Sequence, residues 1–292
     1  MPTICIYASE LAVVLGLNKY QNISDIILKL WEKNYPVDYE NTVSEIKLKK
    51  NIEVVKKESD KDFINRVQGE SNLNIKDQLD ECLKTTDTKK MLETRDLIMR
   101  EVSKNASIGD EVKKEFKKTI ESMTNKNNGT INEKSIREYY SEKSGKRIIV
   151  NEKFIRRDIC TYNGVKWAVG GKIDGITEDD IVIEIKNRIY KLFYELRDYE
   201  KVQLYTYMFI LGLQKGHLVE SMKKKNSNEM EINIIEEEFD KEYWNGVILP
   251  RLNNFIKLFH LFLESVELKN FILLADEDDK KRVIEEFLCK DL

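Results

Sequence analysis

Two carboxylates and a lysine stand in this sequence at a spacing that could support metal-assisted hydrolysis. Asp174, Glu184 and Lys186 fall in GGKIDGITEDDIVIEIKNR, residues 170–188, which predicts two strands joined by a turn at residues 177–180. Side chains alternate between the faces of a strand, so Glu184 and Lys186 share the face opposite to the isoleucines of IVIEIKN. A hairpin folded at this turn would bring Asp174 beside Glu184, and three charged groups would converge on one face of a sheet.

Neighbouring carboxylates of this kind need a positive partner. Two unit charges about 4 Å apart repel by roughly 4 kcal/mol at an effective dielectric constant of about 20. Lys186 offsets part of this repulsion, and a divalent cation offsets more, because carboxylate oxygens are ligands that magnesium prefers. The alternative is an ordinary hairpin with solvated charges, since such spacings are frequent in a chain with 35% charged residues.

A helix predicted over about residues 196–213 adds two polar side chains to this picture. Gln203 and Tyr207 are four residues apart and therefore lie on one face of the helix, which Gly212 closes. Taken singly, Tyr207 could be a half-buried core tyrosine and Gln203 a surface glutamine. The order Asp, Glu-x-Lys, Gln-x3-Tyr is much rarer than either alone. The adjacent stripe is apolar and is expected to contact the sheet; it holds Leu204, Met208 and Leu211.

Other helices and strands must position these residues. Their order along the chain predicts an α/β protein with a central mixed β-sheet flanked by helices. The first 123 residues read as helices, and the polar segment TNKNNGT, residues 124–130, is expected to separate them from the core. A helix ending near Gly145, then strands, the helix above and further strands follow. We predict one domain with a helical N-terminal part at about 1–123, a core at about 129–238 and C-terminal helices at about 239–292.

Composition excludes several classes of protein. The 292 residues, 41% of them apolar with a net charge of −3, predict a folded chain with a sizeable core. No apolar run approaches the roughly 18 residues of a membrane span, and the N-terminal segment lacks the basic start of a secretion signal, so we expect a soluble, intracellular protein without a membrane partner. The four scattered cysteines and two distant histidines favour no zinc site, so any metal should have oxygen ligands.

The segments GGKIDGI, VIEIKNR and YEKVQLYTYMFILG resemble the PD-(D/E)XK nucleases, in particular the branch with a Gln-x3-Tyr helix. That branch includes RecB-like nucleases and the lambda-exonuclease (YqaJ) recombination exonucleases. The opening YASELAVVLGLNKY, residues 7–20, and the pattern from Gly129 to Glu133 favour the exonuclease group. The resemblance covers about residues 7–35 and 129–213, and it implies a restriction-endonuclease-like core with helical elaborations at both ends.

The resemblance also implies a role for each matching residue. Lys186 would activate the attacking water, while Gln203 and Tyr207 would brace the site or touch the DNA backbone. The cofactor would be Mg²⁺, with Mn²⁺ as a substitute. Glu133 also has a local alternative, because Thr130-x-x-Glu133 is a capping box. The implied metal ligands are Glu133, Asp174, Glu184 and the backbone carbonyl of Ile185.

Substrate contacts must come from grouped cations, because the net charge is slightly negative. The resemblance implies that Ser9, which the pattern places at a helix N-terminus, holds a terminal phosphate. No arginine precedes Ser9, although the exonuclease group usually has one there. Arg188 is a further candidate for substrate binding. The other candidate basic groups are Lys47, Lys49 and Lys50; Lys113, Lys114, Lys117 and Lys118; Arg156 and Arg157; and Lys223 to Lys225.

The leading hypothesis is a Mg²⁺-dependent exonuclease that hydrolyses linear duplex DNA in recombination or repair. The family type, and a composition rich in Lys, Asn and Ile, suggest a viral protein acting in the cytoplasm or nucleus of a host. A structure-specific endonuclease, an RNA nuclease and a non-catalytic nucleic-acid-binding module are the alternatives. The resemblance implies two partners, DNA and a single-strand annealing protein. It also implies that the chain forms a homo-oligomer such as a trimer, or remains a monomer.

Overall fold

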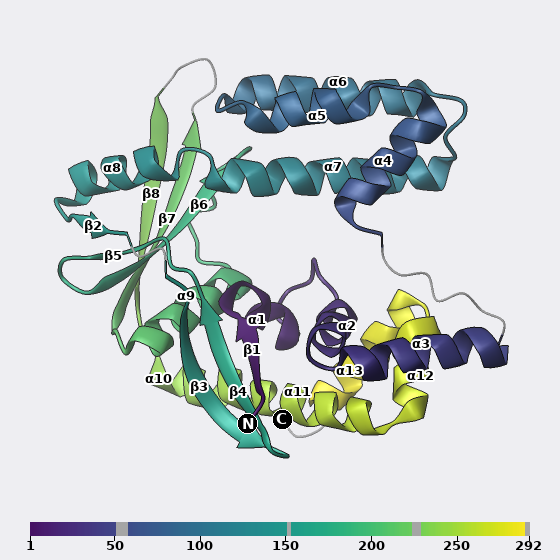
Figure 1. The fold of residues 1–292 in the computed structure, drawn as a ribbon. Coiled ribbons are helices and arrows are strands. Elements are labelled where there is room, and N and C mark those ends of the chain that lie inside the picture. The colour runs from purple at the N-terminus through teal and green to yellow at the C-terminus, as the bar shows by residue number, and fades with distance from the viewer. Residues whose placement is uncertain (51–57, 151–152, 224–228, 290–292) are drawn as a thin grey trace.

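The computed structural model describes residues 1–50, 58–150, 153–223 and 229–289, and within these ranges the strands form two mixed sheets with helices packed around them (Figure 1). The predicted mixed sheet flanked by helices is thus confirmed, with its strands divided between two sheets. The three-stranded sheet has the order β1(Thr3–Tyr7), β4(Val165–Gly171), β3(Ile155–Tyr162). The five-stranded sheet has the order β2(Ile148–Ile149), β5(Gly175–Thr177), β6(Ile181–Arg188), β7(Lys215–Lys223), β8(Met230–Glu238).

Strand β6 is buried on both faces along residues 181–185, and its isoleucines share one face, as its alternating pattern predicts. Ile181, Ile183 and Ile185 pack against Ile136 and Tyr140 of helix α8(Glu133–Ser144). The opposite face of β6 is covered by α9(Asp198–Leu211). The sheet therefore lies between α8 and α9, and the charged side chains of β6 point toward α9.

Helix α9 packs closely on strand β7. Leu204 and Met208 are buried at this contact, as the apolar stripe predicts. A Cβ atom on Gly216 would lie 2.8 Å from the Met208 sulfur, so only glycine allows the helix to approach this far. Gly212 closes α9 in the left-handed conformation, with φ +72°, which confirms the predicted C-terminal end.

The N-terminal region holds a strand that the sequence pattern did not indicate. Strand β1 pairs in parallel with β4, with Ile4 opposite Trp167 and Ile6 opposite Val169. Both isoleucines are buried in the main core. The predicted N-terminal part is therefore not wholly helical, because pairing with a strand about 160 residues away supplied the partner that the short segment needed.

The helices that follow β1 form two groups. The first surrounds the main core and consists of α1(Ala8–Val14), α2(Ile23–Asn34) and α3(Pro36–Lys50). The second packs around its own apolar cluster, which includes Phe63, Val67 and Phe116, and we call it the helical unit. It consists of α4(Asp60–Ser71), α5(Ile75–Lys84), α6(Thr88–Lys104) and α7(Asp110–Thr130), the blue to teal helices of Figure 1.

Residues 124–130 form the last turns of α7, and the predicted separator is wrong. Thr124 and Asn128 are fully buried despite their polarity. The Thr124 hydroxyl donates to the Ile120 carbonyl, and the Asn128 amide donates to the carbonyl of Asn187 in β6. Because a bond within the helix satisfies Thr124 and a tertiary bond satisfies Asn128, the helix continues through a segment of turn-prone composition.

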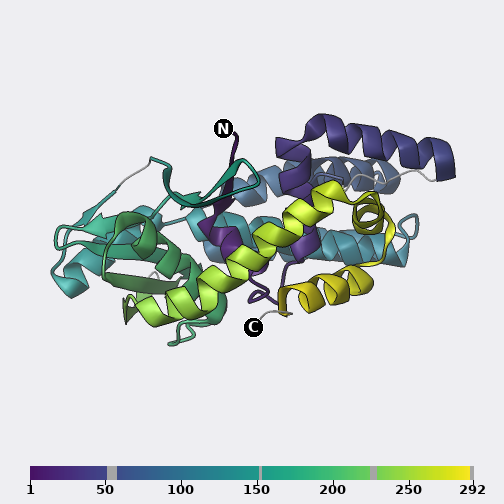
Figure 2. The same ribbon diagram turned by 90° about the horizontal axis from the view of Figure 1, so that it is seen from below.

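The C-terminal helices close the main core from below. Helix α10(Lys241–Tyr243), a π-helical turn at η1(Trp244–Ile248) and α11(Leu249–Glu264) run on as one stretch, which Figure 2 shows along the underside of the molecule. Phe255 and Phe259 of α11 pack edge-on against Trp167 of β4. Helices α12(Val266–Leu274) and α13(Glu277–Cys289) follow, within the range where C-terminal helices were predicted. Within the described ranges, no helix combines the length and the apolar character that crossing a membrane requires.

Candidate active site

The hairpin of β5 and β6 brings Asp174 next to β6, as its spacing predicts. Gly175 lies opposite Ile183 in the antiparallel pair, so the preceding Asp174 is level with Glu184. The backbone N–H of Ile185 donates to Oδ2 of Asp174 over 2.6 Å. This bond ties the half-buried Asp174 carboxylate to the strand that carries Glu184.

Lys186 joins the strand to helix α9. Its ammonium group donates to Oε1 of Glu184 over 2.7 Å and to Oε1 of Gln203 over 3.0 Å. Glu184 is only 3% exposed, whereas the Lys186 side chain keeps 24% of its surface accessible. The structure therefore assembles the predicted Asp, Glu-x-Lys and Gln set at one place, where the lysine is more accessible than Glu184.

Lys186 offsets only part of the cost of burying the two carboxylates of this site. Burial raises the pKa of Glu184 to about 7; the charge of Asp174 acts in the same direction, and Lys186 opposes both. Burial also raises the pKa of Asp174, against the hydrogen bond from the Ile185 N–H. Burial by itself would lower the pKa of Lys186, but Glu184 outweighs it and the net shift is upward, so Lys186 stays charged.

Tyr207 lies in the core beneath these charges. It is 4% exposed and belongs to the main apolar cluster. A Cβ atom on Gly171 of β4 would lie 2.9 Å from the Tyr207 hydroxyl oxygen, so glycine at this position makes room for the phenol. Burial raises the pKa of Tyr207, and the charge of Glu184 adds to the shift, which keeps the phenol protonated. Tyr207 thus supports the site from inside the core.

Glu133 stands apart from the other two carboxylates. It is the first residue of α8, and its carboxylate lies 3.5 Å from the Arg137 guanidinium. Among the described residues, no three Asp, Glu, His or Cys side chains gather closely enough to hold a metal ion. The three predicted carboxylates therefore do not form such a group; Glu133 pairs with Arg137, and its charge contributes to the raised pKa of Asp174. Its role as a metal ligand stays a prediction.

The local alternative for Glu133, a capping box with Thr130, is wrong. A capping box would need the Thr130 hydroxyl at the start of α8, but this hydroxyl donates to the Asn127 carbonyl at the end of α7. The residue that precedes α8 is Asn132, which adopts the left-handed conformation with φ +69° and makes no side-chain capping bond.

The residues present fit a hard divalent cation. Asp174, Glu184 and the Ile185 carbonyl offer only oxygen, which is the donor that Mg²⁺ and Mn²⁺ accept. The raised pKa values of both carboxyl groups show that additional positive charge would stabilise their ionised forms.

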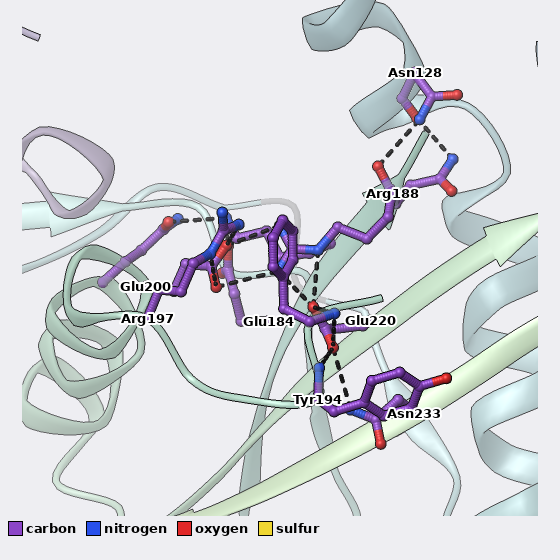
Figure 3. A network of polar contacts seen from close by, with 12 residues as sticks. Asn128, Glu184, Arg188, Tyr194, Arg197, Glu200, Glu220 and Asn233 are labelled. Atoms are coloured by element: carbon purple, nitrogen blue, oxygen red, sulfur yellow. Dashed lines mark hydrogen bonds and ion pairs between the residues drawn. The ribbon is translucent and has the colours of Figure 1, made fainter. Parts of the chain in front are cut away.

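Arg188 is held in a buried network rather than presented to a substrate (Figure 3). Its guanidinium group binds both oxygens of Glu200 in α9 over 2.8 and 3.1 Å, and Glu220 in β7 over 2.9 Å. Burial would raise the pKa of Glu200, but hydrogen bonds from Arg188 and Arg197 produce a net lowering. Arg188 was predicted to contact the substrate. In the structure, two buried glutamates occupy its hydrogen-bond donors.

Glu220 extends this network to the loop between β6 and α9. Its oxygens accept the backbone N–H groups of Phe193 and Tyr194 over 3.2 and 2.9 Å, and the Asn233 amide over 3.2 Å. The network therefore sets where α9 begins. Sequence reasoning missed Glu200 and Glu220; the signals were a glutamate three residues before Gln203 and a glutamate inside the apolar strand HLVESM.

Ser9 lies at the N-terminus of a helix, as predicted, but in the first turn rather than at the capping position. Helix α1 begins at Ala8 with Tyr7 as its capping residue, so Ser9 lies inside the helix and is exposed. The difference arises because β1 continues to Tyr7, which takes the extended conformation that a capping position requires. Binding of a terminal phosphate by Ser9 stays a prediction, and Ser9 is not the capping residue of α1.

The remaining predicted basic groups differ in how far their charge is already paired. Lys49 pairs with Glu45, Lys113 approaches Asp110, and Lys223 lies 3.9 Å from Asp87. The Arg157 guanidinium donates to the Phe209 carbonyl. Lys224 and Lys225, like the side chain of Lys50, lie outside the described part of the chain. Lys114, Lys117 and Lys118 of α7 are exposed.

No protein-family model and no curated protein sequence matches the chain. Three solved structures are similar at low sequence identity. An alkaline exonuclease (LHK-Exo) from Laribacter hongkongensis has 15% identity and a TM-score of 0.39, over 72% of this chain and 97% of that one. LHK-Exo in complex with dAMP has 15% identity and a TM-score of 0.34, over 66% and 89%. SSO0001 has 19% identity and a TM-score of 0.35, over 63% and 83%. The case for a function therefore comes from the side chains of the site.

Proposed function

We propose that this chain is a Mg²⁺-dependent nuclease that hydrolyses phosphodiester bonds from the ends of linear duplex DNA, in recombination or repair. The observation that carries the proposal is the Lys186 ammonium, held between Glu184 and Gln203 beside the Asp174 carboxylate. Phosphodiester hydrolysis needs positive charge where the phosphate oxygens gain negative charge, and this group supplies it. The proposal includes a single-strand annealing protein as a partner. It also includes assembly as a trimer or a monomer.

Each residue of the site has a distinct part in this proposal. Asp174, Glu184 and the Ile185 carbonyl would hold the metal ion, which when bound lowers the pKa of water and screens the phosphate. Lys186 stabilises charge on the phosphate and orients the attacking water. Gln203 keeps the ammonium in place by accepting its hydrogen bond, and Tyr207 fills the space behind the carboxylates.

A non-catalytic nuclease-like binding module is the second candidate. It is favoured by one observation: the described residues do not gather Glu133 with Asp174 and Glu184. Such a module would bind nucleic acid without cutting it.

The deciding experiment uses linear duplex DNA that carries a different label at each end, incubated with Mg²⁺, with Mn²⁺ and with EDTA. We expect release of mononucleotides from linear DNA in Mg²⁺ and no release in EDTA. Cutting of circular DNA would indicate an endonuclease instead, and cutting of RNA alone an RNA nuclease. Binding without any cleavage would contradict the proposal in favour of the binding module.

A further inference from the structure

A cavity of about 520 Å³ lies at the N-terminal end of α9, separate from the carboxylate hairpin. The loop after α1, the residues around the start of α9 and one face of α13 form its walls. We infer that this cavity binds one nucleobase of the substrate strand. The inference rests on the proposed function and adds a binding subsite to it.

Two tyrosines give the cavity an aromatic wall. Tyr20 is 66% exposed, and its ring meets the ring of Tyr199 edge-on, with centroids 5.9 Å apart at an angle of 88°. The edge contact orients the Tyr20 ring and leaves much of its surface accessible. Stacking on such a ring suits any base, because every base has a flat π-face.

Cations lie over both of these rings. The Lys19 ammonium is 5.4 Å from the centroid of Tyr20, and the Arg197 guanidinium is 4.7 Å from that of Tyr199. Each cation keeps its ring in place, since the faces of aromatic rings attract positive charge.

The charges of the walls favour a base over a phosphate. Three cations and three carboxylates line the cavity, so their formal charges cancel, and Arg197 is also bound to Glu200. A phosphate would gain little in such surroundings, whereas a neutral base can use the neighbouring amide groups. The charged residues are Lys19, Arg197 and Lys281, with Glu195, Asp198 and Glu285; the amides are Asn18, Gln21 and Asn22.

The cavity is formed before any ligand arrives. The Asn22 amide and the Ser24 hydroxyl both donate to Oε2 of Glu277, over 2.8 and 3.3 Å, which ties the loop to α13. Gly16 begins this loop in the left-handed conformation, with φ +69°. A preformed wall reduces the ordering cost of binding.

The cavity adjoins the helix that carries Gln203. Asp198, the first residue of α9, lines the cavity and precedes Gln203 by five residues, which corresponds to about 7.5 Å along the helix axis. We therefore place a base of the bound strand, close to the scissile bond, on the Tyr20 ring.

The test measures binding of short single-stranded DNA in EDTA, which prevents cleavage, by fluorescence anisotropy. One abasic nucleotide is moved step by step along the oligonucleotide. For the wild-type chain we expect affinity to fall about tenfold when the abasic nucleotide occupies one particular position. The variant Tyr20→Ala should bind the intact strand about tenfold more weakly, and the abasic nucleotide at that position should then cost nothing more.

The controls separate the cavity from general effects. Tyr20→Phe keeps the ring and should retain wild-type affinity, whereas Tyr139→Ala removes an exposed tyrosine of α8 and should change nothing. Thermal melting verifies that Tyr20→Ala is folded. An abasic penalty that is equal at all positions, or unchanged binding by Tyr20→Ala, would overturn the inference even where Mg²⁺-dependent cleavage upholds the proposed function. Absence of both binding and cleavage would overturn the two together.

Discussion

At the scale of single residues, the Lys186 ammonium is the group on which the proposed chemistry depends. Asp174 and Glu184 are both partly or fully withdrawn from water, and burial favours their neutral forms. Lys186 is the positive group in direct contact with Glu184, and its side chain remains partly accessible to a substrate. A change at this residue should therefore affect catalysis much more than folding.

We predict that Lys186→Ala lowers the rate of DNA cleavage by about 10²- to 10³-fold, which is the usual effect of removing one group that stabilises transition-state charge. Initial rates on end-labelled duplex DNA in Mg²⁺ measure this. The matched control is Lys257→Ala, which removes an exposed lysine of α11 and should cleave at the wild-type rate. Full activity of Lys186→Ala would remove this residue from the mechanism.

At the scale of elements, the site depends on the register between β6 and α9. Two contacts join them: Arg188 binds Glu200, and Lys186 binds Gln203. The later residue of the strand, Arg188, contacts the earlier residue of the helix, Glu200, so the two elements run in opposite directions. Because Glu220 also holds the connecting loop, the buried network of Figure 3 determines where Gln203 stands relative to Lys186.

We predict that Arg188→Ala lowers the free energy of unfolding by about 3–5 kcal/mol, because it leaves buried carboxylates without their partner. Urea denaturation followed by circular dichroism measures this. Arg282→Ala is the control: it removes an exposed ion pair with Asp279 and should cost at most about 1 kcal/mol. Equal, small losses for both variants would mean that Arg188 is not structural and is available to a substrate.

At the scale of the whole molecule, the helical unit is fastened to the end of β6. Asn128 and Asn187 exchange two side-chain-to-backbone hydrogen bonds, and the Arg95 guanidinium donates to the Tyr190 hydroxyl. The helical unit therefore adjoins the strand that carries Glu184 and Lys186. With a net charge of −3, the nucleic-acid binding that we propose must depend on local groups of cations, and the exposed Lys114, Lys117 and Lys118 of α7 form one such group.

We predict that replacing Lys114, Lys117 and Lys118 together by alanine weakens duplex binding in low salt and reduces its dependence on salt. Each ionic contact that is lost should decrease the slope of log K against log salt concentration by about 0.9. Binding measured in EDTA at several salt concentrations checks this, and the two proteins should converge at high salt. Equal slopes for both would place the DNA contacts elsewhere.

The sequence by itself determined the parts of the site that depend on residues close together in the chain. The period of two in IVIEIKN put Glu184 and Lys186 on one face of β6, and the helical period put Gln203 and Tyr207 on one side of α9. The hairpin then brought Asp174 level with Glu184. These features follow from local geometry, which a short stretch of sequence contains.

Only the tertiary structure decided which partners the polar side chains take. Arginine is a residue type that often binds phosphate, yet Arg188 binds two glutamates, one from α9 and one from β7. Glu133 pairs with Arg137 instead of joining the other carboxylates. The pairing of β1 with β4 and the continuation of α7 through Asn128 also depend on residues far apart in the chain. Such choices minimise the cost of burying charges and polar groups across the whole fold, and no local pattern records that balance.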